Sequence, residues 1–149
     1  MKRKYKVMCL FDLIEPASGP GLEKELQTDD WITEQHVLYT LEELGHEVSI
    51  FGLYDDPSAL IQRIKDDRPD VVFNLVEHFD GDRSLDKSVA GILDMLEVPY
   101  TGAGVMGLGI ARDKALAKKV LTYHHVRTPR FFVARRDRRT IIPKNMRFP

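Results

Sequence analysis

The residue run from Val71 to Val76 constrains the fold of this chain more than any other feature of the sequence. It reads Val-Val-Phe-Asn-Leu-Val, and a nearly unbroken apolar stretch of this kind is typical of a β-strand covered on both faces in a parallel sheet. Two strand candidates precede it, the apolar run Tyr5 to Phe11 and the stretch that contains Val48 and Ile50. A short extended piece, Val98 to Thr101, follows it. These segments predict a sheet of four strands.

Segments with apolar residues at helical spacing separate these strands. The first helix is expected to be capped by Asp29 or Asp30 and to end at Gly45, because glycine readily adopts the left-handed conformation that ends a helix. The second begins at Pro57 and ends before Pro69, and the third follows the next polar loop. The order β-α-β-α-β-α-β predicts an α/β fold, an open parallel sheet with right-handed crossovers and helices on both faces.

Ligands in such folds bind beyond the carboxyl ends of the strands. The loops at those ends are therefore the expected location of a functional site, and they comprise residues 12–21, 53–57, 77–83 and 101–107. A chain of 149 residues is long enough for one domain with an appendage.

The pattern changes in the last third of the chain. A glycine-rich stretch leads into a basic helix expected from about Ala111 to His124. After it, Phe131 to Ala134 is predicted to pair with Thr140 to Ile142 in a hairpin, across the charged turn from Arg135 to Arg139.

Charge is distributed unevenly along the chain. Residues 1–100 contain 10 Lys and Arg against 21 Asp and Glu, a net charge of −11, whereas residues 101–149 contain 12 against 2, a net charge of +10. A basic region of this kind suits nucleotide phosphates, nucleic acid or an acidic neighbouring surface, and composition alone does not choose among them.

The single cysteine, Cys9, lies in an apolar run and is expected to be buried and inert, which fits a reducing cytoplasm. The apolar stretch after the basic amino terminus is only about five residues long, too short for a signal peptide or a membrane span. A cytoplasmic location without a membrane partner is therefore expected.

Gly102, Gly104 and Gly107 match the glycine spacing of the dinucleotide-binding fingerprint. That fingerprint normally follows the first strand and is answered by an acidic residue about 20 positions later. Here it follows the fourth predicted strand, and no Asp or Glu lies between Asp113 and Asp137. The context therefore disfavours a nicotinamide-cofactor site.

Two groups of polar residues remain as site candidates. Lys114 and Lys118 lie one turn apart on the expected basic helix, where an ammonium group can reach nucleotide phosphates, although a solvated basic face has the same spacing. Asn74, Glu77 and His78 lie where α/β proteins place ligand-contacting groups, but acidic loop residues are also common on surfaces. Metal binding by His78 and its acidic neighbours follows no ligand-spacing rule, so no metal site is predicted.

A series of short motifs covers residues 70–134. In order along the chain, they are Asp70-Val-Val-Phe-Asn, Gly91-Ile-Leu-Asp-Met-Leu, Val98-Pro-Tyr-Thr-Gly-Ala-Gly104, Arg112-Asp-Lys-Ala-Leu-Ala-Lys-Lys119 and Val126-Arg-Thr-Pro-Arg-Phe131. The series resembles the segment that joins the first domain of ATP-grasp carboxylate-amine ligases of the D-alanine–D-alanine ligase type to their ATP-grasp domain. Residues 1–69 match that family only in their β-α-β-α pattern.

The resemblance implies a pre-ATP-grasp domain over residues 1–103, followed over residues 104–149 by a hinge and the beginning of the small ATP-grasp subdomain. In the family, the lysine that corresponds to Lys114 reaches toward the ATP phosphates, and the glycines from Gly102 to Gly107 become a hinge. The implied reaction phosphorylates the carboxylate of one substrate with ATP and Mg²⁺, and the amine of a second substrate attacks the acyl phosphate. The implied substrate is a small amino-acid or peptide-like molecule, and a homodimer is left open.

The sequence departs from the family pattern at two loops. D-Alanine ligases follow the first strand with Gly-Gly-x-Ser-x-Glu, whose glutamate faces the amino group of the first substrate, whereas this chain has Phe11-Asp-Leu-Ile-Glu-Pro-Ala-Ser18. Glu15 is the candidate for that role. The His-Gly of the family after the third strand is replaced by Val76-Glu-His-Phe79, so Glu77 and His78 are candidate substrate-binding residues without assigned roles. A substrate other than D-alanine is therefore at least as consistent with the sequence.

Ligases of this type continue after a Phe-Pro such as Phe148-Pro149 into a strand with a second phosphate-binding lysine and into the magnesium ligands. After residue 100 only Asp113 and Asp137 carry carboxylates, too few for a usual magnesium site. We therefore expect the 149 residues by themselves to hold no cofactor tightly and to catalyse neither ATP hydrolysis nor ligation. The alternative, a small nucleic-acid- or nucleotide-binding module that uses the basic C-terminal third, predicts an affinity that falls steeply with salt.

Overall fold

The computed structural model describes residues 3–17, 22, 25–144 and 146. The predicted loop residues 19–21 and the Phe148-Pro149 pair lie outside them. By its internal contacts the chain divides into two compact units, Met1–Met106 and Gly107–Pro149. The functional boundary between residues 103 and 104 stays a prediction.

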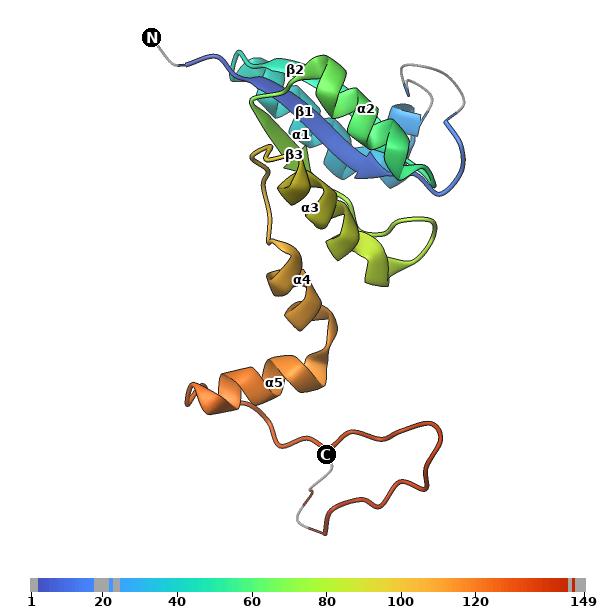
Figure 1. Ribbon diagram of the computed structural model, residues 1–149, viewed down its shortest axis with the longest axis vertical. Coiled ribbons are helices and arrows are strands. Elements are labelled where there is room, and N and C mark those ends of the chain that lie inside the picture. Colours follow the sequence, from blue (N-terminus) through green and yellow to red (C-terminus); the bar gives the residue numbers. More distant parts are fainter. Residues whose placement is uncertain (1–2, 18–21, 23–24, 145, 147–149) are drawn as a thin grey trace. The chain divides into compact units, whose positions relative to one another are not determined.

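The first unit is built on a parallel sheet of three strands, β1 (Lys6–Asp12), β2 (Glu47–Leu53) and β3 (Val71–Asn74), in the order β2-β1-β3. Val7 of β1 pairs with Val48 of β2 and with Val71 of β3. Figure 1 shows α2 in front of this sheet and α1 behind it. The predicted open parallel α/β sheet with helices on both faces is confirmed.

The fourth predicted strand, Val98 to Thr101, forms only an isolated parallel bridge between Val72 and Tyr100. Two backbone hydrogen bonds support the bridge: Val72 N–H donates to the carbonyl of Pro99 at 2.8 Å, and Thr101 N–H donates to the carbonyl of Val72 at 3.0 Å. The segment therefore lies along β3 without becoming a full strand, because a proline cannot donate to the ladder.

Three α-helices connect the strands: α1 (Ile32–Glu43), α2 (Pro57–Asp67) and α3 (Asp86–Met95). Short 3-10 turns also occur, η1 (Glu25–Gln27), η2 (Asp29–Trp31) and η3 (Arg83–Leu85). The start of α2 follows the prediction, since the carboxylate of Asp56 accepts a hydrogen bond from Ser58 N–H at 2.8 Å and Pro57 opens the helix. Gly45 has a φ of 86° after α1, as expected for a residue that ends a helix.

The expected cap of the first helix is wrong. Asp29 and Asp30 lie inside the turn η2, and the residue that precedes α1 is Trp31, whose side chain makes no capping hydrogen bond. The apolar ring of Trp31 instead packs on Phe11, with ring centroids 5.1 Å apart. Packing against the sheet therefore determines where this helix begins.

Side chains of β1 alternate between two hydrophobic clusters, as the period of a strand requires. Met8 and Leu10 lie in a cluster with Leu60 of α2 and Leu93 of α3, and all four are completely buried. Phe11 lies in a second cluster on the other face. Each buried side chain of this size contributes about 1.5–3 kcal/mol to folding, which makes β1 the centre of the unit.

Cys9 is free and completely buried in β1. Burial raises the pKa of its thiol to about 12, with a smaller contribution from the negative charge of Glu42. The thiol is therefore protonated near neutral pH, and the expected burial of Cys9 is confirmed.

The second unit contains the helix α5 (Lys114–Tyr123), and α4 (Val105–Arg112) precedes it. The basic helix expected from about Ala111 to His124 is α5, and it begins at Lys114 because the carboxylate of Asp113 accepts hydrogen bonds from Ala115 N–H and Leu116 N–H, both at 2.9 Å. The glycine-rich stretch is not a loop throughout, since α4 begins before Gly107.

The predicted hairpin is wrong. Among the described residues after Tyr123 there is no strand, although Arg138 N–H donates to the carbonyl of Arg135 at 3.4 Å within the charged turn. Val133, Ile141 and Ile142 are exposed. A lone pair of strands buries too little apolar surface to be stable by itself. None of the helices in the described part of the chain is long and apolar enough to cross a membrane.

Candidate functional site

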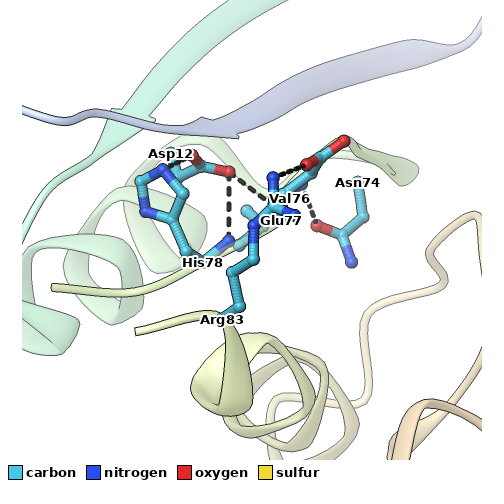
Figure 2. A network of polar contacts seen from close by, with 6 residues as sticks. All are labelled: Asp12, Asn74, Val76, Glu77, His78 and Arg83. Carbon is cyan, nitrogen blue, oxygen red and sulfur yellow. Dashed lines mark hydrogen bonds and ion pairs between the residues drawn. The ribbon is translucent and has the colours of Figure 1, made fainter. Parts of the chain in front are cut away.

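The carboxylate of Asp12 links the carboxyl end of β1 to the loop that follows β3. Asp12 is the last residue of β1, and its Oδ1 accepts hydrogen bonds from the backbone N–H of Glu77 at 2.5 Å and of His78 at 3.4 Å. Its Oδ2 lies 2.6 Å from Nε2 of His78 (Figure 2). One side chain therefore ties the loop after β3 to the end of the neighbouring strand.

The Asp12–His78 pair is shielded from solvent. The two side chains retain 13% and 16% of their exposure, so their hydrogen bond is stronger than one between fully solvated groups. Nε2 faces the carboxylate, so the second ring nitrogen, Nδ1, is the atom left for another contact. Nδ1 is buried and has no hydrogen-bond partner in the described part of the structure. The His78 ring is thus held through Nε2 alone among the described contacts of its two nitrogens.

Asn74 shapes the chain between β3 and this pair. Its backbone N–H donates to Oγ1 of Thr101 at 3.0 Å, and its side-chain Oδ1 accepts from Val76 N–H at 3.2 Å. The amide side chain therefore forms a local turn that directs Glu77 and His78 over the sheet edge. Asn74 acts here as a structural residue.

Asp80 and Asp82 shape the remainder of the loop. Asp80 has a φ of 49°, and its N–H donates to the carbonyl of Tyr54 at 3.3 Å. The carboxylate of Asp82 accepts from Ser84 N–H at 2.7 Å, and this hydrogen bond holds the pKa of Asp82 below its ordinary value. Both residues therefore serve the backbone conformation.

The segment after Asp12 stays close to the sheet and carries Glu15. Leu13 N–H donates to the carbonyl of Leu53 at 2.8 Å. The side chain of Leu13 fills the space beside Gly52, where a Cβ would lie 2.8 Å from Leu13 Cδ1. Gly52 thus permits the close approach that directs Glu15 along the carboxyl edge of the sheet.

A cleft of about 680 Å³ opens at this edge. Its lining includes Glu15, Glu77 and His78, so the structure brings together the three residues predicted to bind substrate. The sequence reasoning did not identify Asp12 or Trp31, which also line the cleft. A charged residue at the end of an apolar strand could have indicated Asp12, whereas no local pattern marks Trp31.

Two carboxylates of the cleft have basic side chains as partners. Asp12 is paired with His78, and Glu77 lies 3.0 Å from the guanidinium of Arg83. The Glu77–Arg83 pair is about 70% exposed on both sides, so it contributes little to stability. Figure 2 shows Arg83 extending from its helix toward the loop that carries Glu77.

Lys114 belongs to the second compact unit, where it is the first residue of α5 and is exposed. The neighbouring candidate Lys118 is engaged, since its Nζ lies 5.2 Å from the ring centroid of Phe131. An exposed ammonium at the positive end of a helix dipole suits an anionic ligand. The role of Lys114 toward ATP phosphates stays a prediction.

An open parallel sheet with a cleft beyond the carboxyl ends of two adjacent strands defines a ligand-binding α/β domain. No family model matches the chain. Several proteins with a known name, however, are similar to it in sequence.

These relatives are D-alanine–D-alanine ligases. The ligase of Moorella thermoacetica is 35% identical over 113 residues, which are 76% of this chain and 34% of the relative. The ligase of Zymomonas mobilis is 31% identical over 119 residues, 80% of this chain and 34% of the relative. The chain belongs to the D-alanine–D-alanine ligase type of ATP-grasp ligases, and it spans about a third of the length of these relatives.

Solved structures agree on the fold. The D-alanine–D-alanine ligase of Bacillus anthracis superposes with a TM-score of 0.62 at 22% identity, over 84% of this chain and 37% of that one. The same ligase complexed with ATP gives a TM-score of 0.70 at 20% identity, over 94% of this chain and 43% of that one. At this level of identity, the likeness concerns the fold.

Proposed function

We propose that this chain carries the substrate-binding domain and the beginning of the nucleotide-binding domain of an ATP-dependent carboxylate-amine ligase. The observation that carries the proposal is the cleft at the carboxyl edge of β1 and β3, where Glu15, Glu77 and His78 lie together. The relationship to D-alanine–D-alanine ligases over 76% of the chain supports it. A cleft of about 680 Å³ suits an amino acid or a small peptide-like molecule.

Glu15 is the residue that we assign to the amino group of the substrate. Its exposed carboxylate lines the cleft, and within the described part of the chain no Lys or Arg forms an ion pair with it. A hydrated carboxylate exchanges water for a substrate ammonium group without the large desolvation cost of a buried ion. Glu15 would therefore fix the amino end of the substrate.

Asp12 is assigned as a positioning residue. It holds the backbone of Glu77 and the ring of His78 in one arrangement before any ligand arrives. Ordering a loop in advance reduces the entropy that ligand binding must overcome. Asp12 would therefore affect substrate affinity through His78 and without contact of its own.

ATP would supply the phosphoryl group that converts the substrate carboxylate into an acyl phosphate. The exposed ammonium of Lys114 fits an ATP phosphate as a point charge. When the amine of the second substrate forms the amide C–N bond, the carbon–oxygen bond to the phosphate breaks, and inorganic phosphate and a proton leave. The residues of this chain would bind and orient the first substrate for that step.

The fluorescence of Trp31 gives a direct test of the cleft. It is the one tryptophan in the sequence, and it lines the cleft, so its emission reports ligand binding without any turnover. D-Alanine, L-alanine and D-alanyl-D-alanine are titrated into the 149-residue chain. A saturable change in emission with at least one of them is expected.

Glu15→Gln should weaken that binding by about tenfold, because it removes one charge-assisted contact. Glu47→Gln is the matched control, since Glu47 is exposed on β2 beside Lys4 and does not line the cleft. The proposal fails if none of the three ligands changes the emission, or if both variants bind them as the parent chain does.

A further inference from the structure

The charge of the cleft exceeds what one substrate amino group requires. Among the described residues, five carboxylates line it, those of Asp12, Glu15, Asp30, Glu34 and Glu77, against one guanidinium and one imidazole. We propose that the substrate bound here carries a second cationic group besides its α-ammonium, as a diamino acid or a peptide with a basic side chain does. This inference rests on the proposed function, because it names the substrate class of the same cleft.

The two basic side chains that line the cleft already have carboxylate partners. His78 is paired with Asp12, and Arg83 is paired with Glu77. For Glu15, Asp30 and Glu34, the described part of the chain offers no cation within ion-pair distance. Three uncompensated carboxylates therefore face the space that a ligand would occupy.

Two of these carboxylates lie at the start of a helical segment, which attracts negative charge but supplies no counterion. Asp30 lies in η2 and Glu34 in the first turn of α1, where the positive end of the helix dipole attracts negative charge. The negative potential that they create in the cleft attracts positive groups and repels the carboxylate of a simple zwitterion.

A zwitterionic amino acid with an apolar side chain matches this cleft incompletely. It brings one ammonium, which the assigned Glu15 would bind, together with one carboxylate, and its net charge is zero. Asp30 and Glu34 would then remain without a counterion inside the occupied cleft. An ω-ammonium or guanidinium group on the substrate side chain would meet them.

Trp31 supplies a second surface that favours an organic cation. Its ring lines the cleft between the acidic residues and is held against Phe11 at a tilt of 54°. An aromatic face attracts ammonium and guanidinium groups, most strongly when the ring is tryptophan. A rigid ring beside carboxylates is thus suited to a cationic side chain.

A metal ion is the other positively charged ligand to consider. Within the described residues, no three His, Cys, Asp or Glu side chains are grouped closely enough to hold a metal ion. Carboxylates spread along the wall of a cleft match a ligand whose charges are separated along a carbon chain. The geometry therefore points to an organic molecule with two cationic groups.

The test compares two ligands that differ only in the second charge. Lysine and norleucine, in both enantiomers, are titrated into the 149-residue chain, with Trp31 emission and isothermal calorimetry as independent measurements. At low salt, one enantiomer of lysine should bind at least about fivefold more tightly than the corresponding norleucine, the effect of one solvent-accessible charge contact. The ratio should shrink in 0.5 M NaCl, because charges are screened more strongly there than at an ionic strength of about 0.1 M, where the screening length is ~10 Å.

Variants test whether the carboxylates of Asp30 and Glu34 cause the preference for lysine. Asp30→Asn and Glu34→Gln, alone and together, should lower the lysine-to-norleucine ratio toward one. Asp29→Asn is the matched control, because Asp29 lies in the same turn but does not line the cleft. Asp30 is exposed, so its variant is expected to fold even if the change at Glu34 disturbs α1.

The outcomes separate this inference from the proposed function. Equal affinity for lysine and norleucine, or tighter binding of norleucine, overturns the substrate with two cationic groups and leaves the amino-acid cleft standing. A lysine preference that Asp29→Asn removes as well as Asp30→Asn also overturns it. Absence of binding by every amino acid tested overturns both.

Discussion

Oδ2 of Asp12 and Nε2 of His78 lie 2.6 Å apart, although the two residues are 66 positions apart in the sequence. The contact joins the end of β1 to the loop after β3. The same carboxylate accepts a hydrogen bond from the backbone N–H of Glu77. One side chain therefore holds two residues that line the cleft, Glu77 and His78.

Replacing Asp12 by Asn should destabilise the chain by about 1–3 kcal/mol, because the imidazole and two backbone N–H groups lose a charged acceptor. Urea unfolding measures this change in the free energy of unfolding. Hydrogen exchange at the amides of Glu77 and His78 should accelerate in the same variant. Asp55→Asn, at an exposed loop position near the same edge, is the control, and equal stability of the two variants would contradict the structural role of Asp12.

Asp82 should make the loop sensitive to acid. Its pKa in the folded chain is held below the ordinary value of 3.8, first by the backbone hydrogen bond from Ser84. Because the folded pKa is the lower one, the stabilisation is complete above the unfolded value and is lost as the pH falls through the folded pKa. An NMR titration of the Asp82 carboxyl should place its midpoint below 3.8, and a midpoint at or above that value would argue against the cap.

Cys9 should resist thiol reagents in the folded chain. With a pKa raised to about 12 by burial, it presents almost no thiolate at pH 8, and its sulfur is inaccessible. Ellman's reagent should therefore react with one thiol per chain in urea and with nearly none in buffer. Rapid labelling of the native chain would mean that β1 opens readily, against its place at the centre of the core.

The 149 residues by themselves should not turn over ATP, since only Asp113 and Asp137 carry carboxylates after residue 100. Release of ADP is measured for the purified chain and for Lys114→Ala, and the two rates should be equal and at background. Release by the parent chain above that of the variant would contradict this expectation.

A DNA mobility-shift titration at two salt concentrations complements the ATP measurement. A chain whose basic region serves nucleotide phosphates should show no specific DNA complex. Tight binding that weakens steeply with salt would instead support the nucleic-acid module.

Local sequence signals were sufficient for much of the first unit. The apolar run after Asp70 predicted β3, Asp56 and Pro57 predicted the start of α2, and the conformation of Gly45 followed from its place after α1. The motifs between residues 70 and 134 predicted the family. In each case the signal lies within a few residues of the structure that it specifies, because backbone conformation and capping depend on near neighbours.

The C-terminal third was harder to predict for the same reason. Alternating residues around Phe131 and Ile141 have the period of two strands, yet no ladder forms between them in the described structure. A strand is stable only when a further layer covers one of its faces, and local spacing carries no information about such a layer.

The sequence by itself determined the fold class and the loop that carries Glu77 and His78, because hydrophobic period and strand order place loops at one edge of a sheet. The resemblance to the ligase family added Glu15 as a candidate. Only the tertiary structure decided that Asp12 holds His78 and that Trp31 stands in the cleft among carboxylates. Those relationships depend on strand register and on packing between distant segments, which bring residues together regardless of their separation along the chain.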